Sequence, residues 1–262
     1  MAVAPAAWID APARMPLPYG LFSVVAFTEG AGRWANGVEW DAGTCDPARG
    51  IGDPSCDPED DTEGLPKDLT FDPSTGSASP FTVYGVWACS PVGATPQQAW
   101  EKARAHLLAR EEARVEQALW TGDLGNTPNL DTLAGTPPTA ASLAAGVGAV
   151  EAALAAGYGS AGVLHMSRAV ASELLTAGGA ETSGGRLRTK LGTPIVAGSG
   201  YPVADRRVIG TAPVFGYRSE VFTPSAAPSN LFDPRRNDLY AVAERTYLLG
   251  FDTCGVAAAT IP

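Results

Sequence analysis

Apolar side chains recur at steps of three and four residues between Thr95 and Thr121, and this spacing predicts one long helix. Thr95 can cap its first turn, and Pro96 suits the first helical position, where a backbone N–H is not needed. Gly122 stands where a left-handed residue ends a helix. A helix of roughly 25 residues is about 37 Å long. We therefore expect a strut that lies across a sheet, with Glu and Arg covering all but a narrow buried stripe. That stripe consists of Trp100, Ala103, Leu107, Leu108, Val115, Ala118 and Leu119.

The rest of the chain contains more predicted strands than helices. β-Branched and aromatic residues fill 21–28 and 81–89, which predicts two strands on either side of an irregular insertion at 29–80. Leu143, Val147, Val150 and Leu154 repeat at helical spacing and predict an amphipathic helix that ends near Gly157. The later elements are a strand at 162–166, a short helix at 167–177 and strand-rich stretches at 191–197, 208–222 and 238–261.

Two motifs, taken with this order of elements, resemble those of a known family. The turn Gly122-Asp-Leu-Gly-Asn-Thr-Pro-Asn-Leu130 follows the long helix, and Leu191-Gly-Thr-Pro-Ile-Val-Ala197 forms a late strand. Across residues 80–261 the chain resembles the major capsid proteins of tailed phages, which have the Hong Kong 97-like fold that encapsulins share. The resemblance implies an α+β fold with an N-terminal arm, an extended loop, a peripheral domain carrying the long spine helix, and an axial domain.

The resemblance also implies a division of the chain into five parts. These are the N-terminal arm at 1–18, the extended-loop hairpin at 19–94, the spine helix and turn at 95–130, the axial domain at 131–225 and peripheral-domain strands at 226–262.

By the same resemblance, we expect a structural protein and not an enzyme: a major capsid subunit that self-assembles into the icosahedral head of a tailed double-stranded DNA phage. Its partners would be copies of itself, in hexamers and pentamers, together with scaffold, portal or decoration proteins. The shell would enclose DNA without sequence-specific binding, would contact no membrane, and would be a virion component assembled in the bacterial host cytoplasm. The alternatives are an encapsulin-type compartment shell, a minor virion shell protein and, in another class, an unrecognised α+β enzyme.

Composition and charge agree with a folded protein that does not grip nucleic acid. The 262 residues are 45% hydrophobic and 18% charged, which excludes wholesale disorder. The formal net charge is −10, whereas a surface that binds phosphate backbones normally carries a basic face. No apolar run reaches about 18 residues, so no membrane-spanning helix is expected. The start of the chain also lacks the basic and apolar regions of a secretion signal.

The insertion at 29–80 carries three candidate intersubunit residues, Trp34, Trp40 and Lys67. Isolated aromatic residues on a polar loop often anchor an interface. The equal alternative is a loop that folds back onto its own domain. Some members of the capsid family cross-link lysine to asparagine, and Asn230 or Asn237 could partner Lys67. The loop shows no motif that carries this chemistry over, so we do not expect it.

The four cysteines fall into two pairs by context. Cys45 and Cys56 both occur as Cys-Asp-Pro within the insertion, and a disulfide between them would contribute about 3 kcal/mol. The alternative is two free thiols in a protein assembled in the cytoplasm. Cys89 and Cys254 lie in apolar, strand-like surroundings, where we expect small buried side chains.

Neither catalytic nor metal chemistry is expected from this sequence, and no cofactor is implied. His106 lies on the charged helix and is expected to be solvated, and His165 is expected to be a hydrogen-bonded core or interface residue. No Cys-x-x-Cys pair accompanies them, so a zinc site is not expected. An acidic run in the insertion could hold calcium, but its spacing and prolines favour a solvated loop. Its members are Asp53, Asp57, Glu59, Asp60, Asp61 and Glu63.

Overall fold

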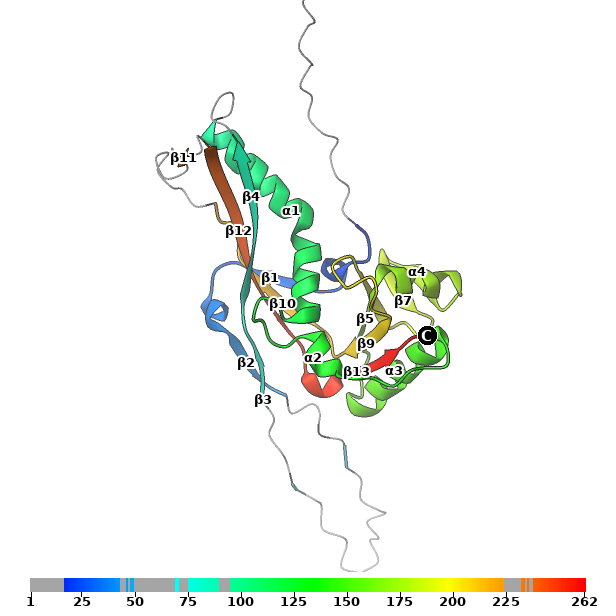
Figure 1. Ribbon diagram of the computed structural model, residues 1–262. Helices are drawn as coiled ribbons and strands as arrows, with labels where there is room; N and C mark the ends of the chain where they lie inside the picture. The colour runs from blue at the N-terminus through cyan, green and yellow to red at the C-terminus, as the bar shows by residue number, and fades with distance from the viewer. Residues whose placement is uncertain are drawn as a thin grey trace, which may run out of the picture.

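The computed structural model describes residues 17–42, 46, 48–49, 69–70, 75–89, 95–223, 232–233, 235 and 238–262. In these parts the chain forms two main sheets. The long helix α1 (Pro96–Thr121) runs along the first sheet and ends beside the second (Figure 1).

The other elements follow in chain order. They are η1 (Leu21–Ser23), β1 (Phe27–Glu29), η2 (Arg33–Asn36), β2 (Val38–Asp41), β3 (Thr75–Ala78), β4 (Phe81–Cys89), α2 (Leu130–Ala134), α3 (Leu143–Gly157), β5 (Val163–Ser167), α4 (Arg168–Thr176), β6 (Ala180–Ser183), β7 (Arg186–Thr189), β8 (Pro194–Gly198), β9 (Arg207–Thr211), β10 (Phe215–Arg218), β11 (Phe232–Asp233), β12 (Asp238–Gly250), η5 (Thr253–Gly255) and β13 (Ala257–Thr260).

Local signals in the sequence determine both ends of α1. The Gln98 N–H donates to Thr95 Oγ1 (3.3 Å) and the Thr95 N–H donates to Gln98 Oε1 (2.9 Å), which completes a capping box. Pro96 opens the helix, and Gly122 follows its last residue in the left-handed conformation, with φ of 68°. The predicted start, length and end of the helix are confirmed.

We call α1 and the first sheet the peripheral unit. Strands β4 and β12 form its long antiparallel ribbon, paired from Phe81↔Tyr247 to Cys89↔Leu239. β12 also pairs with β10 and β11, and β1 lies parallel to β10. Helix α1 packs across the ribbon (Figure 1). Gly85 permits this contact, because a Cβ there would lie 2.6 Å from the Leu107 backbone nitrogen. A larger residue would push the helix away from the strand.

We call the second sheet, with α3 and α4, the axial unit. Its strand order is β13-β9-β5-β8-β7-β6. Leu164, Met166 and Val208 of this sheet share a core with α3 and α4, so both helices cover one face. Val163, Val196 and Ile209 belong instead to the core that contains α1 and the peripheral ribbon. The opposite face of the axial sheet therefore packs against the peripheral unit.

Two sequence-based expectations differ from the structure. The strand predicted at 21–28 is a 3-10 turn, η1, followed by β1, because the N–H groups of Leu21 and Phe22 bond to helix carboxylates instead of a neighbouring strand. In addition, β10 belongs to the peripheral sheet, whereas the C-terminal β13 pairs with β9 of the axial sheet. The chain thus crosses between the sheets at points other than the expected boundaries of 131–225 and 226–262.

Candidate functional site

Three glutamates of α1 point into the protein. Glu111 and Glu116 are buried and Glu112 is half-buried, whereas Leu108 on the same helix is 44% exposed. The predicted stripe was therefore wrong at Leu108, and the expectation that Glu covers only the outer surface was wrong at all three glutamates. A buried carboxylate needs hydrogen-bond or charged partners. The partners found here connect the peripheral unit, the axial unit and residues 18–22, which we call the entering segment.

Glu116 joins α1 to the loop that follows β8. Its Oε2 atom accepts hydrogen bonds from the N–H groups of Ser199 (2.7 Å) and Gly200 (2.8 Å) and from Ser199 Oγ (3.0 Å). Its Oε1 atom accepts one from the Leu21 N–H (2.9 Å). Burial raises the pKa of the Glu116 carboxyl, and these hydrogen bonds oppose the rise. The loop approaches so closely that a Cβ on Gly200 would lie 1.8 Å from the Ala113 carbonyl oxygen.

The entering segment, residues 18–22, is held from two sides. On the helix side, Glu112 Oε1 accepts the Phe22 N–H at 2.8 Å, and burial raises the pKa of this carboxyl against the lowering effect of that bond. On the axial side, the Ala197 N–H donates to the Tyr19 carbonyl (2.8 Å), and Arg168 donates to the Pro18 carbonyl (2.9 Å). The segment is therefore anchored to both units at once.

Glu111 anchors the helix to the peripheral ribbon. It accepts a hydrogen bond from the Tyr247 hydroxyl at 2.7 Å and two from Arg245 Nη1 at 3.2 Å. Burial, followed by the nearby Glu111 carboxylate, raises the pKa of Tyr247 well above its ordinary value. The phenol therefore stays protonated and acts as a donor to Glu111.

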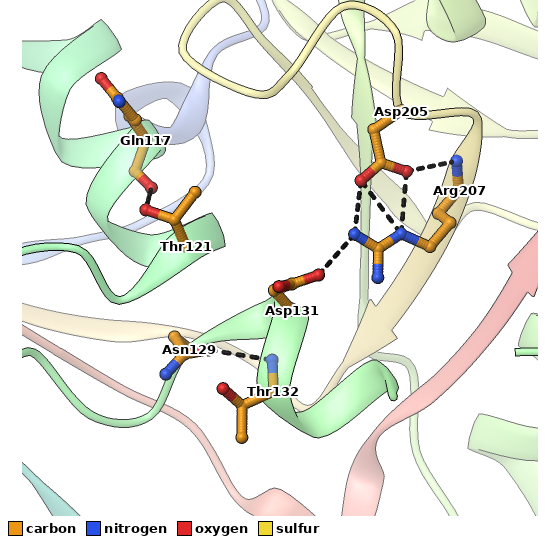
Figure 2. Close-up of polar contacts among 7 residues, drawn as sticks. All are labelled: Gln117, Thr121, Asn129, Asp131, Thr132, Asp205 and Arg207. Carbon is orange, nitrogen blue, oxygen red and sulfur yellow. Dashed lines mark hydrogen bonds and ion pairs between the residues drawn. The ribbon is translucent and has the colours of Figure 1, made fainter. Parts of the chain in front are cut away.

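Arg207 forms a second connection, between β9 and α2 (Figure 2). Its Nε atom bonds to both carboxylate oxygens of Asp205 at 2.8 and 3.0 Å, and its Nη2 atom bonds to Asp131 at 2.6 Å and also to Asp205. The guanidinium lies over the Trp120 ring, 5.5 Å from its centroid. Hydrogen bonding to Asp205 raises the pKa of Arg207 further. Asn129 caps the short helix that carries Asp131 by accepting the Thr132 N–H at 3.0 Å (Figure 2).

His165 lies beneath this connection, on the face of the axial sheet that meets the peripheral unit. Its Nδ1 atom is 2.8 Å from the Tyr201 hydroxyl and its Nε2 atom is 3.1 Å from Thr211 Oγ1. The Tyr201 ring packs against Trp120, with centroids 4.6 Å apart. Burial lowers the pKa of His165 to about 3, so the ring is neutral. The prediction of a buried, hydrogen-bonded histidine is confirmed.

Trp34 and Trp40, the predicted loop anchors, contact their own chain. Trp34 stacks on Tyr217 with centroids 5.8 Å apart, and Trp40 Nε1 donates to Asp252 at 2.6 Å. Trp40 also meets Phe215 edge to face. These contacts fit the loop that folds back, and a role between subunits stays a prediction. Lys67 lies outside the described residues.

The cysteines differ from expectation at one position. Cys254 is exposed and disulfide-bonded in η5, so the expectation of a small buried side chain was wrong there. The strand predicted for Cys89 is confirmed as the end of β4. The candidate pair Cys45 and Cys56 falls outside the described residues.

We call the contacts of Glu112, Glu116 and Arg207 the joint between the two units. His106 is exposed and donates from Nδ1 to the Val86 carbonyl (3.1 Å), and His165 is enclosed. Across the described ranges no three His, Cys, Asp or Glu side chains are grouped as metal ligands. In those same ranges no helix combines the length and apolar character that crossing a bilayer requires.

Solved structures share the fold of this protein over nearly the whole chain. A chain of Microbacterium phage Oxtober96 matches with a TM-score of 0.60 and 12% identity, and the match covers 99% of this chain and 95% of that one. The capsid of the native GTA particle matches with a TM-score of 0.59, 12% identity and the same coverage. Mycobacterium phage Cain gives a TM-score of 0.58 and 13% identity, over 95% of this chain and 91% of that one. No protein-family model and no curated protein matches the sequence. The extent of these matches shows that the chain has the fold of a phage major capsid protein.

Proposed function

We propose that this protein is a structural subunit, the major capsid protein of a tailed double-stranded DNA phage. The observation that carries the proposal is the match to the capsid of the native GTA particle over 99% of this chain and 95% of that one. Nearly every element of the chain thus has a counterpart in a subunit of an assembled particle.

The joint between the two units supports this role. Glu116 of α1 bonds to the loop after β8, and Arg207 of β9 lies over Trp120 of α1, so two separate contacts hold the peripheral and axial units together. Copies of the chain would form hexamers and pentamers. Closed symmetry repeats each weak contact around every ring, so that modest interfaces yield a stable shell.

The remaining partners follow from the same proposal. Scaffold, portal or decoration proteins would assist assembly in the bacterial host cytoplasm, and the finished virion would enclose DNA without sequence-specific contacts. The acidic net charge of −10 is consistent with a container that does not grip its contents.

Negative-stain electron microscopy of the purified protein at rising concentration tests the proposal. We expect hollow icosahedral shells, or rings of five and six subunits. Analytical ultracentrifugation of the same samples should show discrete large species. A monodisperse monomer or dimer at every concentration would contradict self-assembly of the chain on its own.

A further inference from the structure

The charged side chains of α1 are sorted by sign. Three of its four acidic residues turn into the protein, where they form the hydrogen bonds described above. Three of its four basic residues are exposed and form no ion pair with any described residue. They are Lys102, Arg104 and Arg110, which we call the basic set. The fourth, Arg114, pairs with Asp123 at 3.1 Å. Since Glu101 is the one acidic residue of α1 that is exposed, the outer surface of this helix is basic.

The opposite face of the peripheral ribbon carries the other sign. Arg245 of β12 bonds to Glu111 of α1, so its neighbour Glu244 points away from the helix. Glu244 stands opposite Tyr84 of β4, whose side chain is 66% exposed, and it lines a surface hollow together with Glu220. Neither glutamate forms an ion pair with a described residue. The peripheral unit therefore has a basic helix face and an acidic sheet face.

The net charge of −10 does not oppose a basic helix face, because much of that charge belongs to another stretch of the chain. The acidic run at 53–63 contains six acidic residues and no Lys or Arg. The chain outside this run is much closer to neutral, and along the outer surface of α1 the sign is locally reversed.

The composition of this surface is typical of nucleic-acid binding. The core of a protein–protein interface is depleted of charged residues and enriched in aromatic ones. The outer surface of α1 shows the reverse, since Trp120 is buried, Trp100 is half-buried and the basic set is exposed. Basic side chains gathered along one helix are the electrostatic footprint of a protein that binds phosphates.

The spacing of the basic set fits a DNA duplex. Lys102 and Arg110 lie on one flank of α1, eight residues and therefore about 12 Å apart along the helix axis. The major groove of B-form DNA is about 12 Å wide. These two side chains can therefore reach phosphates on both sides of one groove, and Arg104 extends the contact from the other flank of the helix.

We propose that the basic set of α1 contacts the phosphate backbone of double-stranded DNA without reading its sequence. This inference rests on the proposed function and assigns α1 to the side of the shell that faces the enclosed DNA. Each phosphate contact releases counter-ions, so the logarithm of the binding constant falls with the logarithm of the salt concentration, by about 0.9 per contact. Three contacts predict a slope of about −2.7. A contact this weak does not hold DNA to a single copy, and its repetition over a shell makes the sum effective.

A DNA titration does not depend on shell formation. A labelled short duplex is titrated with the full-length protein at several salt concentrations and followed by fluorescence anisotropy. Lys102→Gln with Arg110→Gln should change the slope from about −2.7 to about −0.9 and weaken binding at low salt about tenfold. The matched control, Arg33→Gln with Arg186→Gln, removes the same charge from two exposed arginines elsewhere and should leave the slope unchanged. Equal effects of the two double variants, or no binding by the unaltered protein at low salt, would overturn the proposal.

Two further probes identify the class of partner. A second duplex of unrelated sequence should bind equally well, and a strong preference for either duplex would contradict a contact with the backbone alone. Polyglutamate should bind more weakly, because DNA carries one charge per about 1.7 Å and an extended peptide one per about 3.3 Å. Polyglutamate that binds as tightly as DNA would identify an acidic protein as the partner and overturn the proposal.

Electron microscopy separates this contact from the proposed function. The variant Lys102→Gln with Arg110→Gln leaves the joint intact, so it should form the same shells as the unaltered protein. Loss of shells in this variant alone would mean that the basic set serves contacts between copies, and would overturn the DNA contact. If the unaltered protein forms no shells, the proposed function fails, and the DNA titration still decides the contact.

Discussion

The Glu116 carboxylate on α1 accepts the Gly200 N–H at 2.8 Å, although the two residues are 84 positions apart in the chain. The same carboxylate also accepts hydrogen bonds from the backbone N–H groups of Leu21 and Ser199. One side chain of the long helix thus satisfies backbone donors from a loop of the axial unit and from the entering segment. The backbone N–H groups of Leu21, Ser199 and Gly200 bond to this carboxylate and not to a neighbouring strand, so the carboxylate satisfies donors that would otherwise be buried without a partner.

Glu116→Gln should lower the free energy of unfolding by about 1–3 kcal/mol. The amide keeps one acceptor oxygen but turns an NH2 group toward donors, which leaves buried N–H groups unpaired. Urea denaturation measures the change. Glu101→Gln on the same helix is the control. Among the described residues its exposed carboxylate bonds to the Gln97 side chain alone, and the change should stay within about 0.5 kcal/mol. Equal effects of the two substitutions would contradict the inference that the buried hydrogen bonds of Glu116 stabilise the fold.

The two carboxylates beside Arg207 should differ in their contribution to the free energy of unfolding. The Asp205 side chain is 16% exposed and bonds to the Arg207 backbone N–H as well as its guanidinium, whereas the Asp131 side chain is 54% exposed. Asp205→Asn should lower the free energy of unfolding by about 2 kcal/mol, and Asp131→Asn by less than about 1 kcal/mol. Thermal and urea unfolding of the two variants check this order. The reverse order would mean that the link to α2 carries more of the stability than the contact within the axial unit.

Leu107 and Leu108 are adjacent on α1, but a charged substitution should reduce stability far more at Leu107 than at Leu108. Leu107 is 2% exposed beneath the helix, and Leu108 is 44% exposed. Leu107→Asp should cost about 4 kcal/mol or more, because it buries an unpaired carboxylate against β4, and should abolish folding or assembly. Leu108→Asp should change stability by about 0.5 kcal/mol at most. Circular dichroism and electron microscopy of both variants provide the measurement, and normal particles from Leu107→Asp would contradict the buried position.

The parts of this structure that depend on near neighbours could be predicted from the sequence. Thr95, Pro96 and Gly122 determine the ends of α1 through contacts within a few residues. The helix α3 follows equally from its apolar spacing. The family resemblance, carried by the order of elements and two short motifs, led to the fold that the solved structures share.

The joint could not be predicted, because its partners are remote in the chain. The local sequence around a glutamate on a charged helix does not show whether its side chain faces water or a loop. The groups that Glu116 binds lie 83 to 95 positions away in the chain. The same holds for η1: an apolar run at 21–28 suits a strand, and only the carboxylates of α1 make a turn more stable there. Periodicity alone does not show which flank of the helix the sheet covers, so the spacing places Leu108 in the buried stripe although it is 44% exposed.

His165 should make the stability depend on pH in a defined direction. Its pKa is about 3 in the folded protein and about 6.5 in an unfolded chain, so below pH 6.5 only the unfolded state takes up the proton. This group therefore contributes stability that is present above pH 6.5 and is lost as the pH falls toward 3, by about 1.4 kcal/mol per pH unit. Glu112 and Glu116 act in the opposite sense, because their raised pKa values favour the folded state as the pH falls.

A comparison with His165→Asn isolates the histidine, since the two glutamates titrate alike in both proteins. The variant itself is destabilised at every pH by lost packing and hydrogen bonds to Tyr201 and Thr211. Between pH 7.5 and 5.5 the free energy of unfolding of the natural protein should fall by about 1.4 kcal/mol more than that of the variant. Urea denaturation at the two pH values gives this difference directly. A difference that stays constant between the two pH values would mean that the buried ring takes up a proton as readily as a histidine in water does. That result would contradict the enclosed position of His165 between the two units.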